Sequence, residues 1–222
     1  MDIKSIVFTG SGNEATIGTD TGYYDITRAD LFAFAADFIG EEALPLIKSG
    51  HICDMLPLYA DDGAVCTLEH MSEKLKAIKY SVYLLGINDK SEKTLRSKLK
   101  LKGYSKQATD SAFEILKKNG YLSDERYAKR LCELMANSKL FGKRRLIQEL
   151  LKKGIPYDLC VSTVEETEID FDENLRRLYE KVSKGKNPTC WEEKTKLSDK
   201  LLRYGYSFDE INILFDGIVS DF

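Results

Sequence analysis

Four residues in the first third of the chain are of the types that bind zinc: His51, Cys53, Cys66 and His70. Thiolates and imidazoles are the usual zinc ligands in proteins. One residue separates His51 from Cys53, three separate Cys66 from His70, and twelve lie between the two pairs. This is not the spacing of a zinc knuckle or finger, and it favours buried thiols and surface histidines. A metal site at these four residues is the alternative.

The rest of the chain offers little for catalysis. No histidine occurs after His70, so catalytic triads, Cys–His pairs and His-ligated metals have no candidates from residue 71 to 222. The glycine motifs that bind phosphate are also absent. The acidic clusters at 170–173 and 192–193 are typical of the first turn of a helix, where carboxylates favour the positive end of the helix dipole. We expect neither an enzyme nor a bound cofactor.

The composition is that of a soluble, folded protein. The chain has 222 residues, of which 43% are hydrophobic and 31% are charged. No apolar run approaches the roughly 18 to 20 residues that a membrane span needs, and no secretory signal follows Met1. The cysteines are odd in number and form no Cys-x-x-Cys motif, which fits reduced thiols in a cytosol. They are Cys53, Cys66, Cys132, Cys160 and Cys190.

The net charge of −3 hides a strong asymmetry. Residues 1–71 hold 3 basic and 12 acidic side chains, residues 72–155 hold 21 and 9, and residues 156–222 hold 9 and 15. A basic middle segment in an acidic chain indicates a polyanionic partner or an acidic protein groove. The alternative is a lysine-rich helical surface that is merely solvated. A hypothesis that rests on charge alone is that the acidic first third covers the basic middle.

The first third is predicted to contain strands. Residues 3–8, 14–17 and 23–26 are β-prone and are separated by turn residues. Thr27 to Asp30 has the spacing of a capping box before the apolar run 31–35. We expect a hairpin or three-stranded sheet leading into helices, with a domain boundary near residue 70.

The remainder is predicted to be an internal repeat of 51 residues. Gly103, Gly154 and Gly205 stand at this spacing, and each suits the left-handed position after a short helix. Ser105 and Ser207 are expected to cap the following helix, with proline in the middle copy. Large apolar residues recur eight and four residues before each glycine and one and ten after it: Leu95, Leu99, Tyr104 and Phe113; Leu146, Leu150, Ile155 and Val164; Leu197, Leu201, Tyr206 and Phe215.

An earlier helix leads each copy, at 75–85, 125–135 and 174–182. The predicted fold is therefore mainly α: three tandem three-helix repeats in an elongated array, after a small N-terminal β-containing segment. The predicted domains are 1–70, 71–120, 121–170 and 171–222.

Several segments of the chain resemble the RecX family of recombination regulators. They are Leu99–Tyr104, Gly120–Ala128, Gly142–Ile147, Glu149-Leu150 and Lys153–Ile155. The resemblance is clear over 72–165, extends over 171–222 through the repeat, and does not include 1–71. Residues 86–91 lack the arginine-rich turn that often precedes the serine in this family.

The resemblance implies a cytoplasmic bacterial protein that binds RecA filaments and lodges in their helical groove. Such a protein damps ATP hydrolysis, strand exchange and coprotease activity in DNA repair, recombination and the SOS response. It implies no catalysis by the chain itself.

Basic residues of the predicted helices are the candidate contacts with RecA or DNA. Lys93, Arg96 and Lys100 are spaced i, i+3, i+7 and form one stripe. The full set of candidates is Lys93, Arg96, Lys100, Arg126, Lys129, Arg130, Lys143, Arg144, Arg145, Lys152, Lys153, Lys196 and Arg203.

Four of these candidates recur at matching positions. Arg145 and Lys152 lie on the side of their helix away from the leucines, and Lys196 and Arg203 stand 51 residues later. Stacked repeats would place the four in one line, which suits an extended anionic lattice better than a compact ligand.

Two hypotheses of function stay open. The first is a monomeric regulator that binds RecA filaments, with single- or double-stranded DNA as a weaker partner and no membrane association. The second is a direct DNA-binding helical-repeat protein with no RecA requirement, because basic helix–turn–helix-like modules also bind DNA. For Arg126, an ion pair with Asp124 or Glu133 is the alternative to a partner contact.

Overall fold

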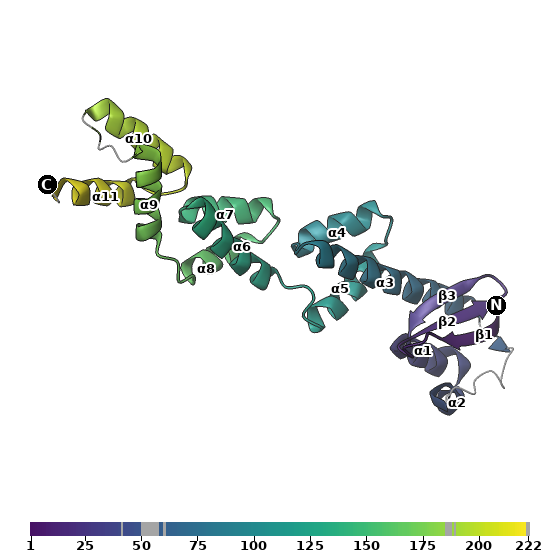
Figure 1. Ribbon diagram of the computed structural model, residues 1–222. Coiled ribbons are helices and arrows are strands. Elements are labelled where there is room, and N and C mark those ends of the chain that lie inside the picture. Colours follow the sequence, from purple (N-terminus) through teal and green to yellow (C-terminus); the bar gives the residue numbers. More distant parts are fainter. Residues whose placement is uncertain (41, 50–57, 60, 185–187, 189, 221–222) are drawn as a thin grey trace. The chain divides into compact units, whose positions relative to one another are not determined.

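The computed structural model describes the chain except for residues 41, 50–57, 60, 185–187, 189 and 221–222. The described chain is mainly helical, with a small sheet near its start (Figure 1). It forms two compact units. Unit 1 comprises Met1–Asn88 and Leu95–Leu122, and unit 2 comprises Asp89–Thr94 and Ser123–Phe222.

Unit 1 begins with a four-stranded antiparallel sheet in the order β3-β2-β1-β4. The strands are β1 (Asp2–Phe8), β2 (Glu14–Thr19), β3 (Tyr23–Thr27) and β4 (Leu58–Tyr59). One face of the sheet is apolar, and Ile6, Ile17 and Ile26 are buried on it. The first three strands confirm the prediction. The two-residue β4 was missed because so short a strand leaves no alternation in the sequence.

The helices that follow the sheet share its core. Helix α1 (Arg28–Phe34) is capped by Thr27, whose hydroxyl accepts from the Asp30 N–H at 3.1 Å, as the capping spacing predicts. It continues into a π-helical turn, η1 (Ala35–Ile39), which is followed by α2 (Ala43–Ser49) and the long helix α3 (Asp62–Ile87). Ala64 and Leu68 of α3 are buried in the same apolar cluster as the strands.

Helix α3 begins well before the predicted residue 75, because the sheet packs against its first half. It therefore runs through residue 70 without a break. The division into 1–70, 71–120, 121–170 and 171–222 stays a prediction.

From α3 onward the described helices form three three-helix repeats, which confirms the predicted fold class. The first repeat is α3, α4 (Glu92–Leu101) and α5 (Lys106–Lys118). The second is α6 (Asp124–Lys139), α7 (Lys143–Lys152) and α8 (Tyr157–Glu165). The third is α9 (Phe171–Ser183), α10 (Trp191–Arg203) and α11 (Phe208–Ser220). Residues 90–160, all of which the structure describes, contain no strand.

The three glycines end the middle helices in the predicted left-handed conformation. Their φ values are 95° at Gly103, 85° at Gly154 and 96° at Gly205. At the first of these turns the N–H of Tyr104 donates to the Leu99 carbonyl at 3.1 Å, the bond that closes a Schellman cap. The glycines of the 51-residue period therefore mark the C-terminal caps of the three middle helices.

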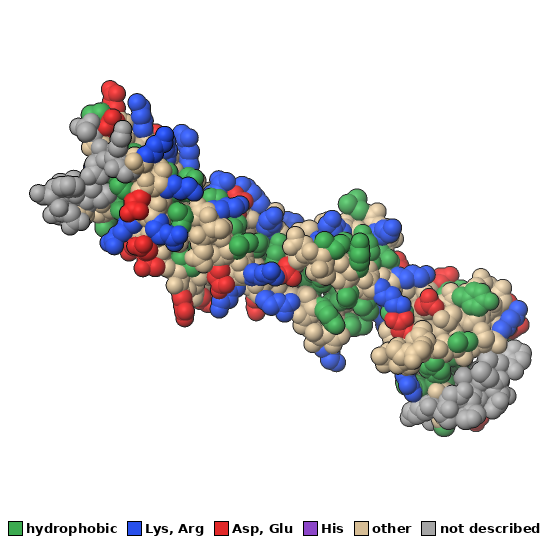
Figure 2. All heavy atoms as spheres, in the orientation of Figure 1, with side chains coloured by type: hydrophobic (Ala, Val, Ile, Leu, Met, Phe, Trp, Pro, Cys, Tyr) green, Lys and Arg blue, Asp and Glu red, His purple; other side chains and the backbone are tan. Residues whose placement is uncertain are grey.

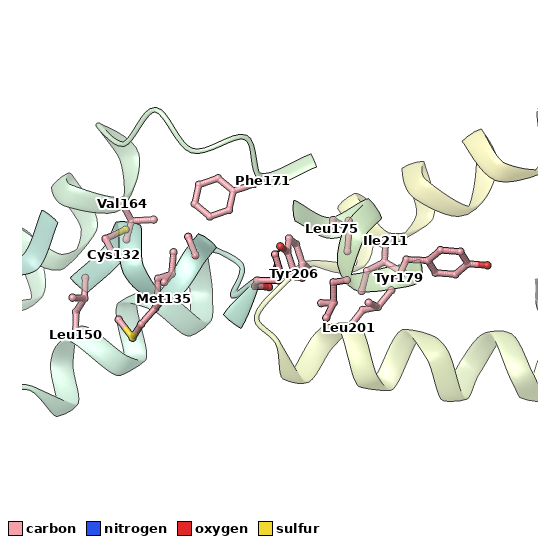
Figure 3. Close-up of a cluster of buried hydrophobic side chains, with 14 of the residues drawn as sticks. Cys132, Met135, Leu150, Val164, Phe171, Leu175, Tyr179, Leu201, Tyr206 and Ile211 are labelled. Atoms are coloured by element: carbon pink, nitrogen blue, oxygen red, sulfur yellow. Dashed lines mark hydrogen bonds between the residues drawn. The ribbon is translucent and has the colours of Figure 1, made fainter. Parts of the chain in front are cut away.

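The second and third repeats share one hydrophobic core within unit 2. Tyr206 lies between the side chains of the two repeats, with Cys132 and Met135 on one side and Leu175 and Ile211 on the other (Figure 3). Its ring is almost fully buried, and its hydroxyl donates to a backbone carbonyl of the second repeat at 3.2 Å. Tyr206, one of the apolar residues of the 51-residue period, thus joins the second and third repeats.

Candidate partner-binding surface

The middle helices of the second and third repeats meet end to end. The N–H of Gly142 donates to the Tyr204 carbonyl at 2.9 Å, and the N–H of Arg144 donates to the Gly205 carbonyl at 3.3 Å. Donors at the start of α7 are thereby paired with acceptors just beyond the end of α10, groups that a helix leaves unpaired on its own. A Cβ on Gly142 would lie 2.7 Å from the Gly205 oxygen, so this approach requires glycine.

The start of α4, which belongs to unit 2, makes an equivalent contact with the end of α7. Here the donors are side-chain hydroxyls and not backbone N–H groups. Ser91 and Thr94 both donate from their hydroxyls to the Lys153 carbonyl. Ser91 and Lys153 precede Gly142 and Tyr204 by 51 residues. The 51-residue period therefore applies to the contact between middle helices too.

Two of the strongest candidates, Arg145 and Lys152, are neutralised within α7. Glu149 accepts from the Arg145 Nη2 at 2.9 Å and from the Lys152 Nζ at 2.8 Å. The hydrogen bond from Lys152, with the positive charges of Lys152 and Arg145, holds the pKa of Glu149 below its usual value despite partial burial. The Arg145 guanidinium also lies 5.5 Å from the centre of the Phe141 ring. Both cations are therefore already paired with groups of α7 and its neighbouring residues.

The equivalent positions of α10 carry three cations and no such clamp. Lys196 and Arg203 correspond to Arg145 and Lys152, and Lys200 stands where α7 has Glu149. All three side chains are exposed, and they form no ion pair or ring contact with the described residues. Sequence reasoning missed Lys200, although the 51-residue alignment with Glu149 points to it.

Charge is divided between the helices of unit 2. Helix α7 has four basic residues and one acidic residue, and α10 has four and three, whereas α8 and α11 have only acidic ones, two and three. Lys and Arg side chains gather over α7 and α10, and Asp and Glu side chains appear where α8 lies (Figures 1 and 2). The side formed by the middle helices can therefore attract a negatively charged surface.

The stripe predicted on α4 is interrupted. Arg96 forms an ion pair with Asp110, and its guanidinium lies 4.6 Å from the centre of the Phe113 ring. Lys93 and Lys100 are exposed on the same helix. Arg96 is thus held within unit 1, so the three basic residues do not form a continuous exposed row. The contact of this stripe with a partner stays a prediction.

The remaining candidates are exposed but differ in their contacts. Arg130 pairs with Asp89 at 2.5 Å, and the Lys143 ammonium lies 5.3 Å from the Phe171 ring centre. The other exposed candidates are Arg126, Lys129, Arg144 and Lys153. Their contact with a partner stays a prediction.

Of the four residues weighed as alternative zinc ligands, Cys66 and His70 lie among the described residues. His51 and Cys53 lie outside the described residues, and within the described ranges no group of three or more His, Cys, Asp or Glu side chains could hold a metal ion. Cys66 is exposed on α3, so the expectation of a buried thiol is wrong there: two residues from the buried Leu68, it falls on the opposite side of the helix. Cys132 is buried, and burial raises the pKa of its thiol to about 11.

The described helices from α3 onward define an all-helical protein of three three-helix repeats, whose middle helices expose basic side chains. A family model described as the second three-helix domain of RecX matches residues 123–160. Regulatory protein RecX of Actinobacillus pleuropneumoniae serotype 5b (strain L20) is 36% identical over 144 residues, which cover 63% of this chain and 91% of that protein. Regulatory protein RecX of Trichlorobacter lovleyi is 35% identical over 126 residues, covering 55% and 82%. The chain belongs to the RecX family of regulatory proteins, as the sequence resemblance predicted.

Solved structures support the fold. A crystal structure of regulatory protein RecX superimposes with a TM-score of 0.73 over 97% of this chain and 98% of that chain, at 18% identity. The structure of RecX from Lactobacillus salivarius gives a TM-score of 0.60 over 65% and 96%, at 20% identity. No helix among the described residues has both the length and the apolar character needed to cross a membrane.

Proposed function

We propose that this chain is a cytoplasmic, monomeric regulator that binds RecA filaments and lowers their ATPase, recombinase and coprotease activities. Its role would lie in DNA repair, recombination and the SOS response, and it would act by binding alone. Family membership supports this function. The structural observation that carries it is the set of exposed cations on α10 that have no partner among the described side chains.

Repeated modules suit a filament, because a filament presents the same surface at regular intervals. A single exposed ion pair contributes about 0–1 kcal/mol, so one contact would not hold such a complex. Several similar contacts made by successive repeats act together, since the first one raises the effective concentration of the next. The exposed candidate residues of the middle helices other than the neutralised Lys152, with Lys200 added, are the proposed contacts.

The test is a titration of the cognate recombinase, assembled on single-stranded DNA, with the full chain. We expect the rate of ATP hydrolysis to fall as the chain is added, and the chain to sediment with the filaments. Unchanged hydrolysis together with no co-sedimentation would reject the proposal.

Direct DNA binding is the second candidate function. It is favoured by Lys143 and Arg144, which are exposed side by side in a first helical turn that contains no carboxylate. Anisotropy of a labelled oligonucleotide, measured at several salt concentrations without recombinase, separates the two candidates. Tight binding with a steep loss on added salt would favour DNA, and a recombinase requirement would favour the filament.

A further inference from the structure

The three exposed cations of α10 form one ridge on a rigid helix. Lys196, Lys200 and Arg203 are four and three residues apart, so they share a face and succeed one another at about 6 and 4.5 Å along the helix axis. The opposite face is held in the core of unit 2 by Leu197 and Leu201. Core packing therefore fixes the spacing of the ridge before any partner arrives.

The ridge differs from its counterpart on α7 in the sign of the charge at one position. In α7, Glu149 neutralises the cations on both sides of it. In α10, Lys200 takes that position and adds a third positive charge, which repels the other two. Three like charges within two helical turns destabilise an isolated helix slightly, so the ridge gains from an external group of opposite charge.

The carboxylates around the ridge indicate the chemistry of that external group. Asp199 is exposed between Lys196 and Arg203, and Glu192 and Glu193 occupy the first turn of the same helix. A nucleic-acid backbone is negative at every phosphate, so these carboxylates oppose it. A protein surface of mixed charge can place carboxylates against the ridge and a cation against Asp199, which also fixes the register of the complex.

We infer that the α10 ridge, Lys196, Lys200 and Arg203, contacts an acidic protein surface of the partner and not its nucleic acid. The inference rests on the proposed function, because it assigns one surface within the complex with the recombinase filament.

The experiment compares charge reversal with charge exchange in the full chain. The reversal variant is K196E/K200E/R203E, and the exchange variant K196R/K200R/R203K keeps all three charges. A matched reversal, K106E/K117E/K118E, changes three exposed lysines of α5 by the same total charge. Circular dichroism checks that each variant is helical, and K196Q/K200Q/R203Q replaces the reversal variant if that one does not fold.

Two affinities are measured for each variant: for recombinase filaments on single-stranded DNA, and for the same oligonucleotide without recombinase. We expect the reversal to weaken filament binding about ten- to hundredfold and oligonucleotide binding less than threefold. The exchange variant and the α5 variant should change either affinity less than threefold.

The two affinities distinguish a failure of the inference about the ridge from a failure of the proposed function. If the unaltered chain binds filaments and the reversal variant binds them equally well, the ridge is not a contact, and the proposed function stands. An equal loss for the bare oligonucleotide would assign the ridge to nucleic acid and overturn the inference. Failure of the unaltered chain to bind filaments would reject the proposed function itself.

Discussion

The turns at Gly103 and Gly205 have the same backbone conformation but different surroundings. Their φ values are 95° and 96°. A Cβ on Gly103 would meet none of the described atoms within 4 Å, whereas a Cβ on Gly205 would lie 2.4 Å from both the Cβ and the backbone nitrogen of Arg145. Glycine is needed at 103 for its conformation alone, and at 205 also to leave room for the first turn of α7. Equivalent positions of a repeat therefore share local structure without sharing tertiary contacts.

The largest expected effect of this difference is that of Gly205→Ala. The left-handed backbone costs a residue with a Cβ about 1–2 kcal/mol, and the overlap with α7 adds about 1–3 kcal/mol. Gly103→Ala should cost only the first of these. Urea denaturation of the full chain, followed by circular dichroism, measures both. Equal losses of unfolding free energy would show that the contact with Arg145 is relieved without cost.

Gly142→Ala tests the contact without the conformational penalty. Gly142 has an ordinary φ of −76°, but a Cβ there would lie 2.7 Å from the Gly205 oxygen and 2.9 Å from the Tyr206 nitrogen. We expect a loss of about 1–3 kcal/mol, since the ends of α7 and α10 must separate. Hydrogen exchange should show reduced protection of the amides at 142 and 144. Unchanged protection would mean that the two ends are not held together by these bonds.

The sequence predicted what depends on neighbours along the chain. The glycine caps, the serine caps and the buried leucines follow from residue type and spacing, because each acts within one or two helical turns. The close approach of Gly142 to Gly205 could not be predicted this way, because it depends on where another repeat packs. The early start of α3 was missed for the same reason, since the sheet and not the repeat covers its first half.

The candidate site shows the same limit within a single helix. Helical spacing correctly placed Arg145 and Lys152 away from the buried leucines, but it did not show that Glu149 neutralises them. The spacing of Glu149, four and three residues from these cations, was a signal that sequence reasoning could have used. The packing of Arg145 on the Gly205 turn had no such signal.

The smallest expected effect concerns positions 149 and 200, where the repeats carry opposite charges. The pKa of Glu149 is lowered in the folded chain, so its carboxylate stabilises the fold above the pKa of an unfolded glutamate, about 4.3. This contribution is lost as the pH falls through the lower folded-state pKa. Glu149→Gln should therefore cost about 0.5 kcal/mol at pH 7, a small value because the partner cations are partly exposed, and almost nothing near pH 3.

Lys200→Gln removes a charge that has no ion-pair partner among the described residues, so it should leave the unfolding free energy unchanged or slightly higher at pH 7. Urea denaturation of both variants at the two pH values measures the contrast. A loss at position 200 as large as that at 149 would mean that the lysine is paired within the fold and is not available to a partner.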